Sequence, residues 1–408
     1  MGKILHLDNG TPLLYEKITH INSFSMGIYV KTGAIDEKEN ESGISHFIEH
    51  MLFKGTEKRS AKDISEEIDN IGGKMNAYTS KDTTTFYITA LSEHFKTATD
   101  VLADIFLNST FTEENIEKEK KVVIEEIRMY EDIPEEKIHD INNEYIFIGN
   151  YGKNILGTED SINSLTREMV LDYYKDRYTS DNIAIVVVGN LSEEEVLTTF
   201  NTYFKNFTTA KRDRIKKPEF KLNTVKNVLK KEISQVHLCV NTLGSSYASE
   251  DRYINSILSI ILGGNMSSRF FQKIREEKGL AYSVYTFNTS FHEGGAFSVY
   301  AGTTKENYNE VINMIYEEWK DIKENGVTEK ELIKAQNQVL SSLILGLETT
   351  RARMSRLASS YITYNKIIPL KEIENKIKSI DREAVKKYAN KIFDEKYYSV
   401  TILGDVNE

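Results

Sequence analysis

The sequence predicts an α+β protein made of two homologous halves, and three observations carry this prediction. The chain has 408 residues, of which 40% are hydrophobic, so it can form two cores rather than one. A segment near the middle of the chain is repeated near its end. Around both copies, strand-like runs rich in β-branched residues alternate with helical runs of ten or more residues.

The repeat pairs residues 164–191 with residues 379–406, without gaps and at a constant offset of 215 residues. Each copy is typical of a helix with a capping serine, Ser164 or Ser379, followed by a turn and a β-branched strand that ends at glycine. The repeat therefore indicates the duplication of a folding unit. The identical pairs are Ser164/Ser379, Arg167/Arg382, Glu168/Glu383, Val170/Val385, Tyr173/Tyr388 and Gly189/Gly404.

Elements earlier in each half follow the same order. Strand-like stretches at 23–34 and 234–244 each lead into a helical run that ends in glycine, at 42–55 and 251–264. Residues 83–91 alternate in polarity, which predicts a strand with one covered face. This order predicts the same strand–helix unit in both halves.

The boundary between the halves is predicted at residues 209–220. This stretch is polar and basic and contains one of the four prolines, as expected of a linker. An ordinary surface loop is the alternative, and it would leave the boundary in place. The halves are then 1–208 and 221–408.

Composition excludes several kinds of partner. A net charge of −10 and a pI near 5.5 argue against nucleic acid or an anionic membrane. Cys239 is the only cysteine, so no internal disulfide can form and a reducing compartment fits best. The opening residues have no long apolar segment, and the apolar run at 183–189 is far shorter than a membrane span. We therefore expect a soluble, cytoplasmic protein.

The helical run at 43–55 holds a candidate metal site. His46 and His50 lie four residues apart, so they stack on one face of a helix, and Glu49 lies beside them. Two imidazoles so placed can reach one tetrahedral Zn²⁺, which leaves the carboxylate to hold a water molecule. This H-x-x-E-H order is the inverted form of H-E-x-x-H. The alternative is a buried helix that merely contains two histidines, but buried polar groups without partners are costly.

A catalytic zinc needs a third protein ligand, and the helix predicted at 114–132 can supply one. Glu126 and Glu119 lie seven residues apart on the flank of its apolar stripe, whereas Glu125 points to the opposite side. Glu126 is the better candidate ligand, and Glu119 is a candidate supporting carboxylate. A Glu-rich amphipathic helix without any function is the alternative. The apolar stripe consists of Ile116, Val123, Ile127 and Tyr130.

Several motifs, in order and spacing, resemble the pitrilysin/insulinase family of zinc metallopeptidases. They are "HFIEHMLFKGT", "GGKMNAYTSKDTTTFY", "VVIEEIRMYED" and, in the second half, "LGGNMSSRFFQKIREEKGLAYSVYTF". Length and the two-half layout are most similar to the branch related to mitochondrial processing peptidase and its bacterial members. The resemblance covers essentially the whole chain.

The resemblance implies a role for each matching residue near the metal. His46, His50 and Glu126 would bind one zinc ion per chain, and Glu49 would be the general base that takes a proton from the zinc-bound water. Glu119 matches a family carboxylate that orients the ligands.

The resemblance also implies how substrate binds. Asn76 and Ala77 match the edge strand on which the family lays its substrate as an added strand. Phe53 matches a residue of the pocket for the side chain after the scissile bond. Arg275 and Tyr282, from the second half, match residues that contact the substrate backbone. The expected activity is endopeptidase cleavage of extended or unfolded polypeptides in a two-half clamshell, by a homodimer or by a heterodimer with a related subunit.

Two alternative functions stay open at this point. The chain could be a catalytically silent structural subunit, although such relatives typically lose the metal residues that this sequence retains. It could also be a zinc-binding interaction module that never cuts peptide. Aligned on Gly55 and Gly264, the second half has asparagine and serine in place of the two histidines, so only the first half is predicted to bind metal.

Overall fold

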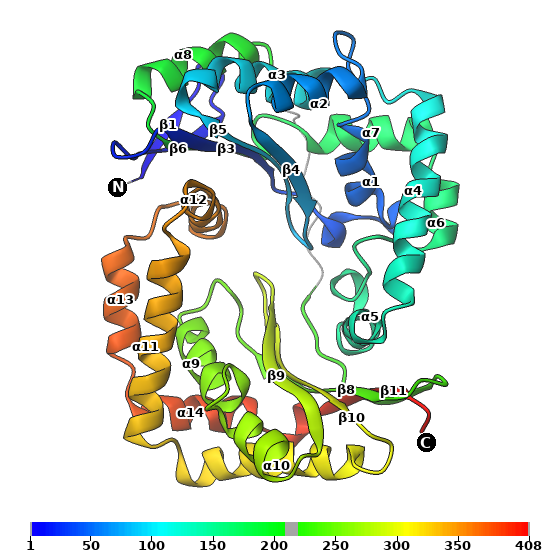
Figure 1. Cartoon of the computed structure of the whole chain (residues 1–408), viewed down its shortest axis with the longest axis vertical. Helices are drawn as coiled ribbons and strands as arrows, with labels where there is room; N and C mark the ends of the chain where they lie inside the picture. The colour runs from blue at the N-terminus through cyan, green and yellow to red at the C-terminus, as the bar shows by residue number, and fades with distance from the viewer. Residues whose placement is uncertain (1, 209–218, 407–408) are drawn as a thin grey trace. The chain divides into compact units, whose positions relative to one another are not determined.

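The computed structural model describes residues 2–208 and 219–406, which form two compact units. Unit 1 comprises Met1–Arg128, Lys153–Lys217 and Gly346–Ile368, and unit 2 comprises Met129–Gly152, Pro218–Leu345 and Pro369–Glu408. Most of the predicted linker at 209–220, residues 209–218, lies outside the described residues. Each unit combines one sheet with helices on both of its faces, so the predicted α+β class is confirmed (Figure 1).

Unit 1 is built on a six-stranded sheet in the order β1-β2-β6-β3-β5-β4 (Figure 1). Only β2 and β6 pair in parallel, and the other neighbours are antiparallel. All seven residues of β6 are buried because this β-branched strand has a strand on each side and helices on both faces. The strands are β1 (Lys3–His6), β2 (Pro12–Lys17), β3 (Ser23–Val30), β4 (Lys74–Thr79), β5 (Thr84–Leu91) and β6 (Ile183–Gly189).

Helices cover both faces of this sheet. On one face lies the main core, which is dense in phenylalanine. On the other face, Met354, Leu357 and Tyr361 of α12 (Thr350–Tyr364) pack on Tyr29 and Tyr87. The helices on the main-core side are α1 (Ile44–Met51), α2 (Ala61–Asn70), α3 (Phe95–Asn108), α4 (Glu113–Glu131), α6 (Glu159–Ser164), α7 (Arg167–Arg177) and α8 (Glu193–Phe204).

Unit 2 repeats this topology with one strand fewer. Its sheet has the order β7-β11-β8-β10-β9, with β7 and β11 parallel and the rest antiparallel, as in β2-β6-β3-β5-β4. The predicted duplication is therefore confirmed strand by strand. The strands are β7 (Lys226–Lys230), β8 (Val236–Gly244), β9 (Ala281–Ser290), β10 (Gly295–Thr303) and β11 (Ser399–Gly404).

The main core of unit 2 surrounds Trp319, which stacks on Phe393 at 4.8 Å between ring centroids. The opposite face of the sheet is covered by Ile138 and Ile141 of α5 (Pro134–Ile146). The remaining helices are α9 (Asp251–Gly263), the π-helical η5 (Phe271–Glu277), α10 (Tyr308–Asn325), α11 (Glu329–Gly346), α13 (Leu370–Lys378) and α14 (Arg382–Ile392).

Two equivalent helices are exchanged between the units, which the division into 1–208 and 221–408 did not anticipate. At the offset of 215, α4 and α5 correspond to α11 and α12. The helix α5 packs on β8 and β11 of unit 2, whereas α12 packs on β3 and β6 of unit 1. Each sheet thus receives its second layer from the other half of the sequence.

The predicted helix caps are wrong by two residues. Ser164 is the last residue of α6 and Ser379 follows α13 directly. The side chains that accept a backbone N–H at the start of α7 and α14 belong to Thr166 and Asp381. A cap must directly precede the first helical residue, which the serines do not.

Leu357→Ala tests the exchanged helix. Leu357 is fully buried between α12 and the sheet of unit 1, so we expect the free energy of unfolding to fall by about 2–5 kcal/mol. Leu345→Ala, at a leucine that is 63% exposed on α11, is the matched control and should change it by less than about 1 kcal/mol. Equal effects in urea denaturation would contradict the packing of α12 on this sheet.

Candidate metal centre

The short helix α1 carries the histidine pair, and a buried carboxylate holds its start. Gly43 precedes the helix with φ of 87°, a left-handed conformation that favours glycine. Glu37 accepts hydrogen bonds from the backbone N–H groups of Gly43 at 2.8 Å and Ser45 at 3.0 Å. The Ser45 hydroxyl also bonds the Tyr173 hydroxyl of α7 at 2.8 Å. These contacts fix the first turn, and with it His46, against the main core.

The pKa of Glu37 is raised to about 7. Burial causes this rise, and the hydrogen bonds from Ser45 and Gly43 lower the pKa only in part. A carboxylate at a helix N-terminus is favoured by the helix dipole, but Glu37 is only 1% exposed. Its proton uptake is therefore expected near neutral pH.

His46, His50 and Glu126 form the only group of three metal-ligating side chains in residues 2–208 and 219–406. One ligand atom from each lies within 4.8 Å of the others. The nearest Glu126 oxygen is 3.8 Å from His46 Nε2 and 3.5 Å from His50 Nε2. Ligand atoms about 2.0–2.1 Å from a tetrahedral zinc are spaced roughly 3.4 Å apart, so the three residues fit this ion. Glu125 points away and pairs with Arg128, in agreement with the helical-wheel prediction.

Electrostatics keeps His46 in the form that binds metal. Burial, together with the neighbouring His50, lowers the pKa of His46 to about 3. A neutral imidazole is the metal-binding form. The His46 Nδ1 atom is buried and has no hydrogen-bond partner within the described part of the chain. His46 is therefore uncharged. Its other ring nitrogen, Nε2, faces Glu126 and can donate its lone pair to a metal ion.

Glu119 contacts the ring nitrogen of His50 that does not face Glu126, and this contact fixes the orientation of the ring. Its Oε1 atom lies 2.9 Å from His50 Nδ1, and its Oε2 atom lies 2.7 Å from Lys54 Nζ. Burial alone would raise the pKa of Glu119, but the hydrogen bonds from His50 and Lys54 outweigh it and the pKa is lowered. The charged carboxylate therefore accepts a hydrogen bond from the Nδ1–H group and leaves His50 Nε2 free for metal.

The side chain of Glu49, a residue of α1, faces the edge strand β4. Its Oε2 atom accepts a hydrogen bond from the Thr79 hydroxyl at 2.6 Å. Burial raises the pKa of Glu49, which the Thr79 hydrogen bond and His50 counteract and Glu126 reinforces. Raised carboxylate pKa values suit a group that accepts and returns a proton near neutral pH.

The predicted substrate residues of unit 1 lie next to Glu49. Asn76 and Ala77 are in β4, which is the last strand of the sheet and pairs only with β5. Asn76 Oδ1 accepts the Ala77 N–H at 2.8 Å. Phe53 follows α1 and packs near Phe86 of β5, which is paired with Ala77. The strand edge, the Phe53 ring and the Thr79 partner of Glu49 thus belong to one part of the fold.

Arg275 and Tyr282 belong to unit 2. The Arg275 guanidinium lies over the ring of Tyr282 at 5.0 Å and over that of Phe271 at 4.6 Å. Tyr282 is 75% exposed at the start of β9. The two residues are in contact with each other, and they lie in a unit other than the one that carries the histidines.

The metal positions have counterparts in unit 2 that cannot serve the same purpose. Asn255 replaces His46 and bonds Asn288 and Tyr388, while Ser259 replaces His50 and bonds Thr286. At the offset of 215, Glu119 and Glu126 correspond to Lys334 and Ser341 of α11.

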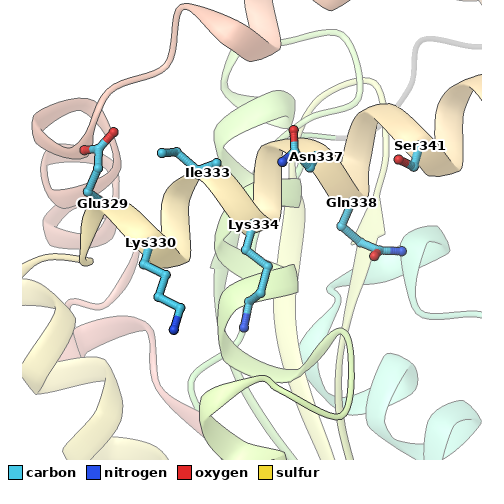
Figure 2. Close-up of a pocket in the computed structure, with 7 residues that line it drawn as sticks. All are labelled: Glu329, Lys330, Ile333, Lys334, Asn337, Gln338 and Ser341. Carbon is cyan, nitrogen blue, oxygen red and sulfur yellow. The ribbon is translucent and has the colours of Figure 1, made fainter.

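A hollow of about 770 Å³ runs along this face of α11. Figure 2 shows that its labelled side chains all project from this one helix, with Lys330 and Lys334 on the same side. A single glutamate and two lysines cannot form a zinc site. The hollow is lined by Glu329, Lys330, Ile333, Lys334, Asn337, Gln338 and Ser341.

Sequence reasoning missed three residues around the histidines. Lys54 lies four residues after His50, and helical spacing alone could have indicated it. Thr79 is within a motif used for the family resemblance, but no sequence signal links it to Glu49. Glu37 precedes α1 by several residues in a polar loop and carries no distinguishing pattern.

Fold and site together are those of a two-unit metallopeptidase, and the comparisons agree. Residues 13–159 match the family model for insulinase (peptidase family M16), and residues 164–339 match that for the peptidase M16 inactive domain. The chain is 39% identical over 391 residues to the uncharacterized zinc protease YmxG of Bacillus subtilis, covering 95% of each. The chain belongs to the insulinase family of peptidases, M16.

Further similarities support this assignment. An uncharacterized zinc protease of Streptomyces coelicolor is 32% identical, over 98% of this chain and 89% of the relative. A protease from Helicobacter pylori has the same fold, with a TM-score of 0.90 at 19% identity and 99% coverage of both chains. A structure described as a peptidase M16 inactive domain from Pseudomonas fluorescens also gives 0.90, at 18% identity, covering 99% of this chain and 98% of the other. No helix among residues 2–208 and 219–406 combines the length and apolarity needed to cross a membrane.

Glu119→Gln tests the support of the metal ligands. We expect it to lower zinc affinity about 10- to 100-fold, because the amide no longer fixes the Nδ1 proton of His50 with a charge. Glu125→Gln, on the exposed side of α4, should leave the affinity unchanged. Competition with a fluorescent chelator measures both, and equal affinities would contradict the role of Glu119.

Glu37→Gln tests the buried carboxylate through pH. Folded Glu37 has a pKa of about 7 against an ordinary value of 4.5, so between these values the native state holds a proton that the unfolded state has lost. Its stabilising contribution is complete below pH 4.5 and is lost as the pH rises to 7. We therefore expect the stability of the variant, relative to wild type, to rise by up to about 3 kcal/mol over this window.

Urea denaturation of the metal-free proteins at several pH values measures this difference. Glu39→Gln, at an exposed position in the same segment, is the control and should show no such slope. A pH-independent difference for Glu37→Gln would contradict the raised pKa.

Proposed function

We propose that this protein is a zinc-dependent endopeptidase that hydrolyses extended or unfolded peptides. His46, His50 and Glu126 would hold one zinc ion per chain. The observation that carries the proposal is the position of Glu49, a half-buried carboxylate that directly precedes His50 in α1 and is hydrogen-bonded to Thr79 of the edge strand β4. A metal-binding module without catalysis has no need of such a base.

The residues around Glu49 suit proton transfer. Zinc, when bound, supplies a Lewis acid that polarises the scissile carbonyl and acidifies water. Glu49 accepts the proton of the attacking water and returns it to the leaving amine. The Thr79 hydroxyl holds one oxygen of Glu49, which leaves the other oxygen to take the proton. Glu119 keeps the Nδ1 proton on His50 throughout.

Substrate would bind by strand addition to β4. The edge of β4 at Asn76 and Ala77 would offer backbone hydrogen bonds once the Asn76 side chain releases the Ala77 N–H, and Phe53 offers an apolar contact for one side chain. Arg275 and Tyr282 would contact the substrate backbone, with the Tyr282 hydroxyl as a donor to the developing oxyanion.

The cellular setting is part of the same proposal. We infer a cytoplasmic enzyme of the processing-peptidase-like branch that works as a homodimer or as a heterodimer with a related subunit. The retention of all three candidate ligands and of Glu49 in one place supports an active rather than a silent member.

Glu49→Gln tests the activity directly. With an unstructured quenched-fluorescent peptide, we expect wild type to cut and the variant to lose at least about 100-fold in kcat, because the amide cannot accept a proton. The variant should keep its zinc, since Glu49 is not one of the three ligands. Glu57→Gln, exposed just after α1, is the matched control and should cut normally. Zinc in both proteins without cleavage by wild type would contradict the peptidase proposal and favour a binding module.

A further inference from the structure

The edge strand β4 has two faces with different chemistry. Thr79 and Ala77 point to the main-core side, where Thr79 meets Glu49 and Ala77 packs on the core. Lys74, Asn76 and Tyr78 alternate with them and point to the side covered by α12. The pairing of Asn76 with Tyr87 agrees, because Tyr87 packs in the core beneath α12.

Lys74 is one cationic side chain on this face of β4, and a second, Arg351, reaches the same face from α12. The guanidinium of Arg351, at the start of this helix, stacks over the ring of Tyr87 at 4.5 Å. Tyr87 in turn lies 6.3 Å from Tyr78 of β4. Thr350 bonds Ser25, which bonds Thr89 of β5, so the first turn of α12 is tied to the strand next to the edge.

Both cations lack a carboxylate partner. Within residues 2–208 and 219–406, no carboxylate lies within 4.0 Å of the charged groups of Arg351 or Lys74. By contrast Arg353, two residues along α12, pairs with Glu16 at 3.0 Å. A guanidinium that stacks by its face keeps its in-plane N–H donors available, in the geometry that matches a carboxylate.

We propose that Arg351 and Lys74 form a subsite for acidic side chains of the peptide that adds to β4. This inference rests on the proposed function and deepens it, since it names a substrate class. An added strand alternates its side chains as β4 does, so the residue over Phe53 has neighbours that point to the Arg351 side. Strands lie about 4.8 Å apart, so the added strand lies about 9.6 Å from β5, over which Arg351 stacks, and an acidic side chain and the long arginine side chain together span this distance.

Because the whole protein is negatively charged, the preference for acidic side chains is confined to peptide positions near Arg351 and Lys74. At −10, the chain as a whole repels an acidic peptide. A gain from acidic residues therefore depends on where they fall along the strand. We expect acids to favour binding at alternate positions only, because every second side chain faces Arg351.

A glutamate scan tests the subsite. One glutamate, or one glutamine as its uncharged match, is moved through successive positions of a fluorescent unstructured peptide. Affinity is measured by anisotropy with the Glu49→Gln protein, and kcat/KM with wild type. At low salt we expect glutamate to bind about two- to fivefold more tightly than glutamine at alternate positions, and less so at high salt.

Variants assign the effect to a residue. Arg351→Gln should remove the alternating preference, and Arg351→Glu should reverse it in favour of lysine. Lys366→Gln removes one charge just beyond the other end of α12 and should leave it intact. No preference at any position, or one that survives in Arg351→Gln, would overturn the subsite even if peptides are cut. An alternating preference in binding without cleavage by wild type would support the subsite and refute the peptidase proposal alone.

Discussion

The contact between α1 and α4 is the interaction on which the rest of the site depends. Each helix presents a row of polar groups toward the other, His46 and His50 from one and Glu119 and Glu126 from the other. Spacings of four and seven residues correspond to about one and two helical turns, so each pair of side chains lies on one face of its helix. Burial of such groups costs free energy unless partners or an ion offset it. Glu119 already has His50 and Lys54 as partners, and a cation bound by His46, His50 and Glu126 would satisfy the other three, which is why we propose a metal centre here rather than a buried helix pair.

Duplication supplied the scaffold for this contact twice, but only one copy has the chemistry. In unit 2 the equivalent positions carry Asn255, Ser259, Lys334 and Ser341, and the first two are satisfied by neighbouring hydroxyl and amide groups. The exchanged helices α5 and α12 are also equivalent elements that the duplication supplied twice. Each covers a sheet face that would otherwise expose apolar side chains, such as Tyr87 in unit 1 and Tyr300 in unit 2. In unit 1 this cover also brings Arg351 close to the strand edge.

Local patterns predicted much of this structure. The spacing of His46 and His50 and the helical wheel of α4 predicted the three grouped side chains, and the repeat predicted the duplicated sheet. The caps at Ser164 and Ser379 were wrong because helix ends depend on single residues. The exchange of α5 and α12 was missed because amphipathicity shows that a helix is buried but not against which sheet. Thr79 was missed because its contact with Glu49 depends on how β4 packs beside α1.

Anomalous diffraction at the zinc edge, from crystals of protein purified without added metal, tests the central claim most directly. The account predicts one strong peak per chain, about 2.0–2.2 Å from His46 Nε2, His50 Nε2 and a Glu126 oxygen. The counterpart positions in unit 2 should show none. A peak elsewhere would contradict the assignment of this site and the function built on it. The absence of any peak after zinc is added back to the crystals would contradict them equally.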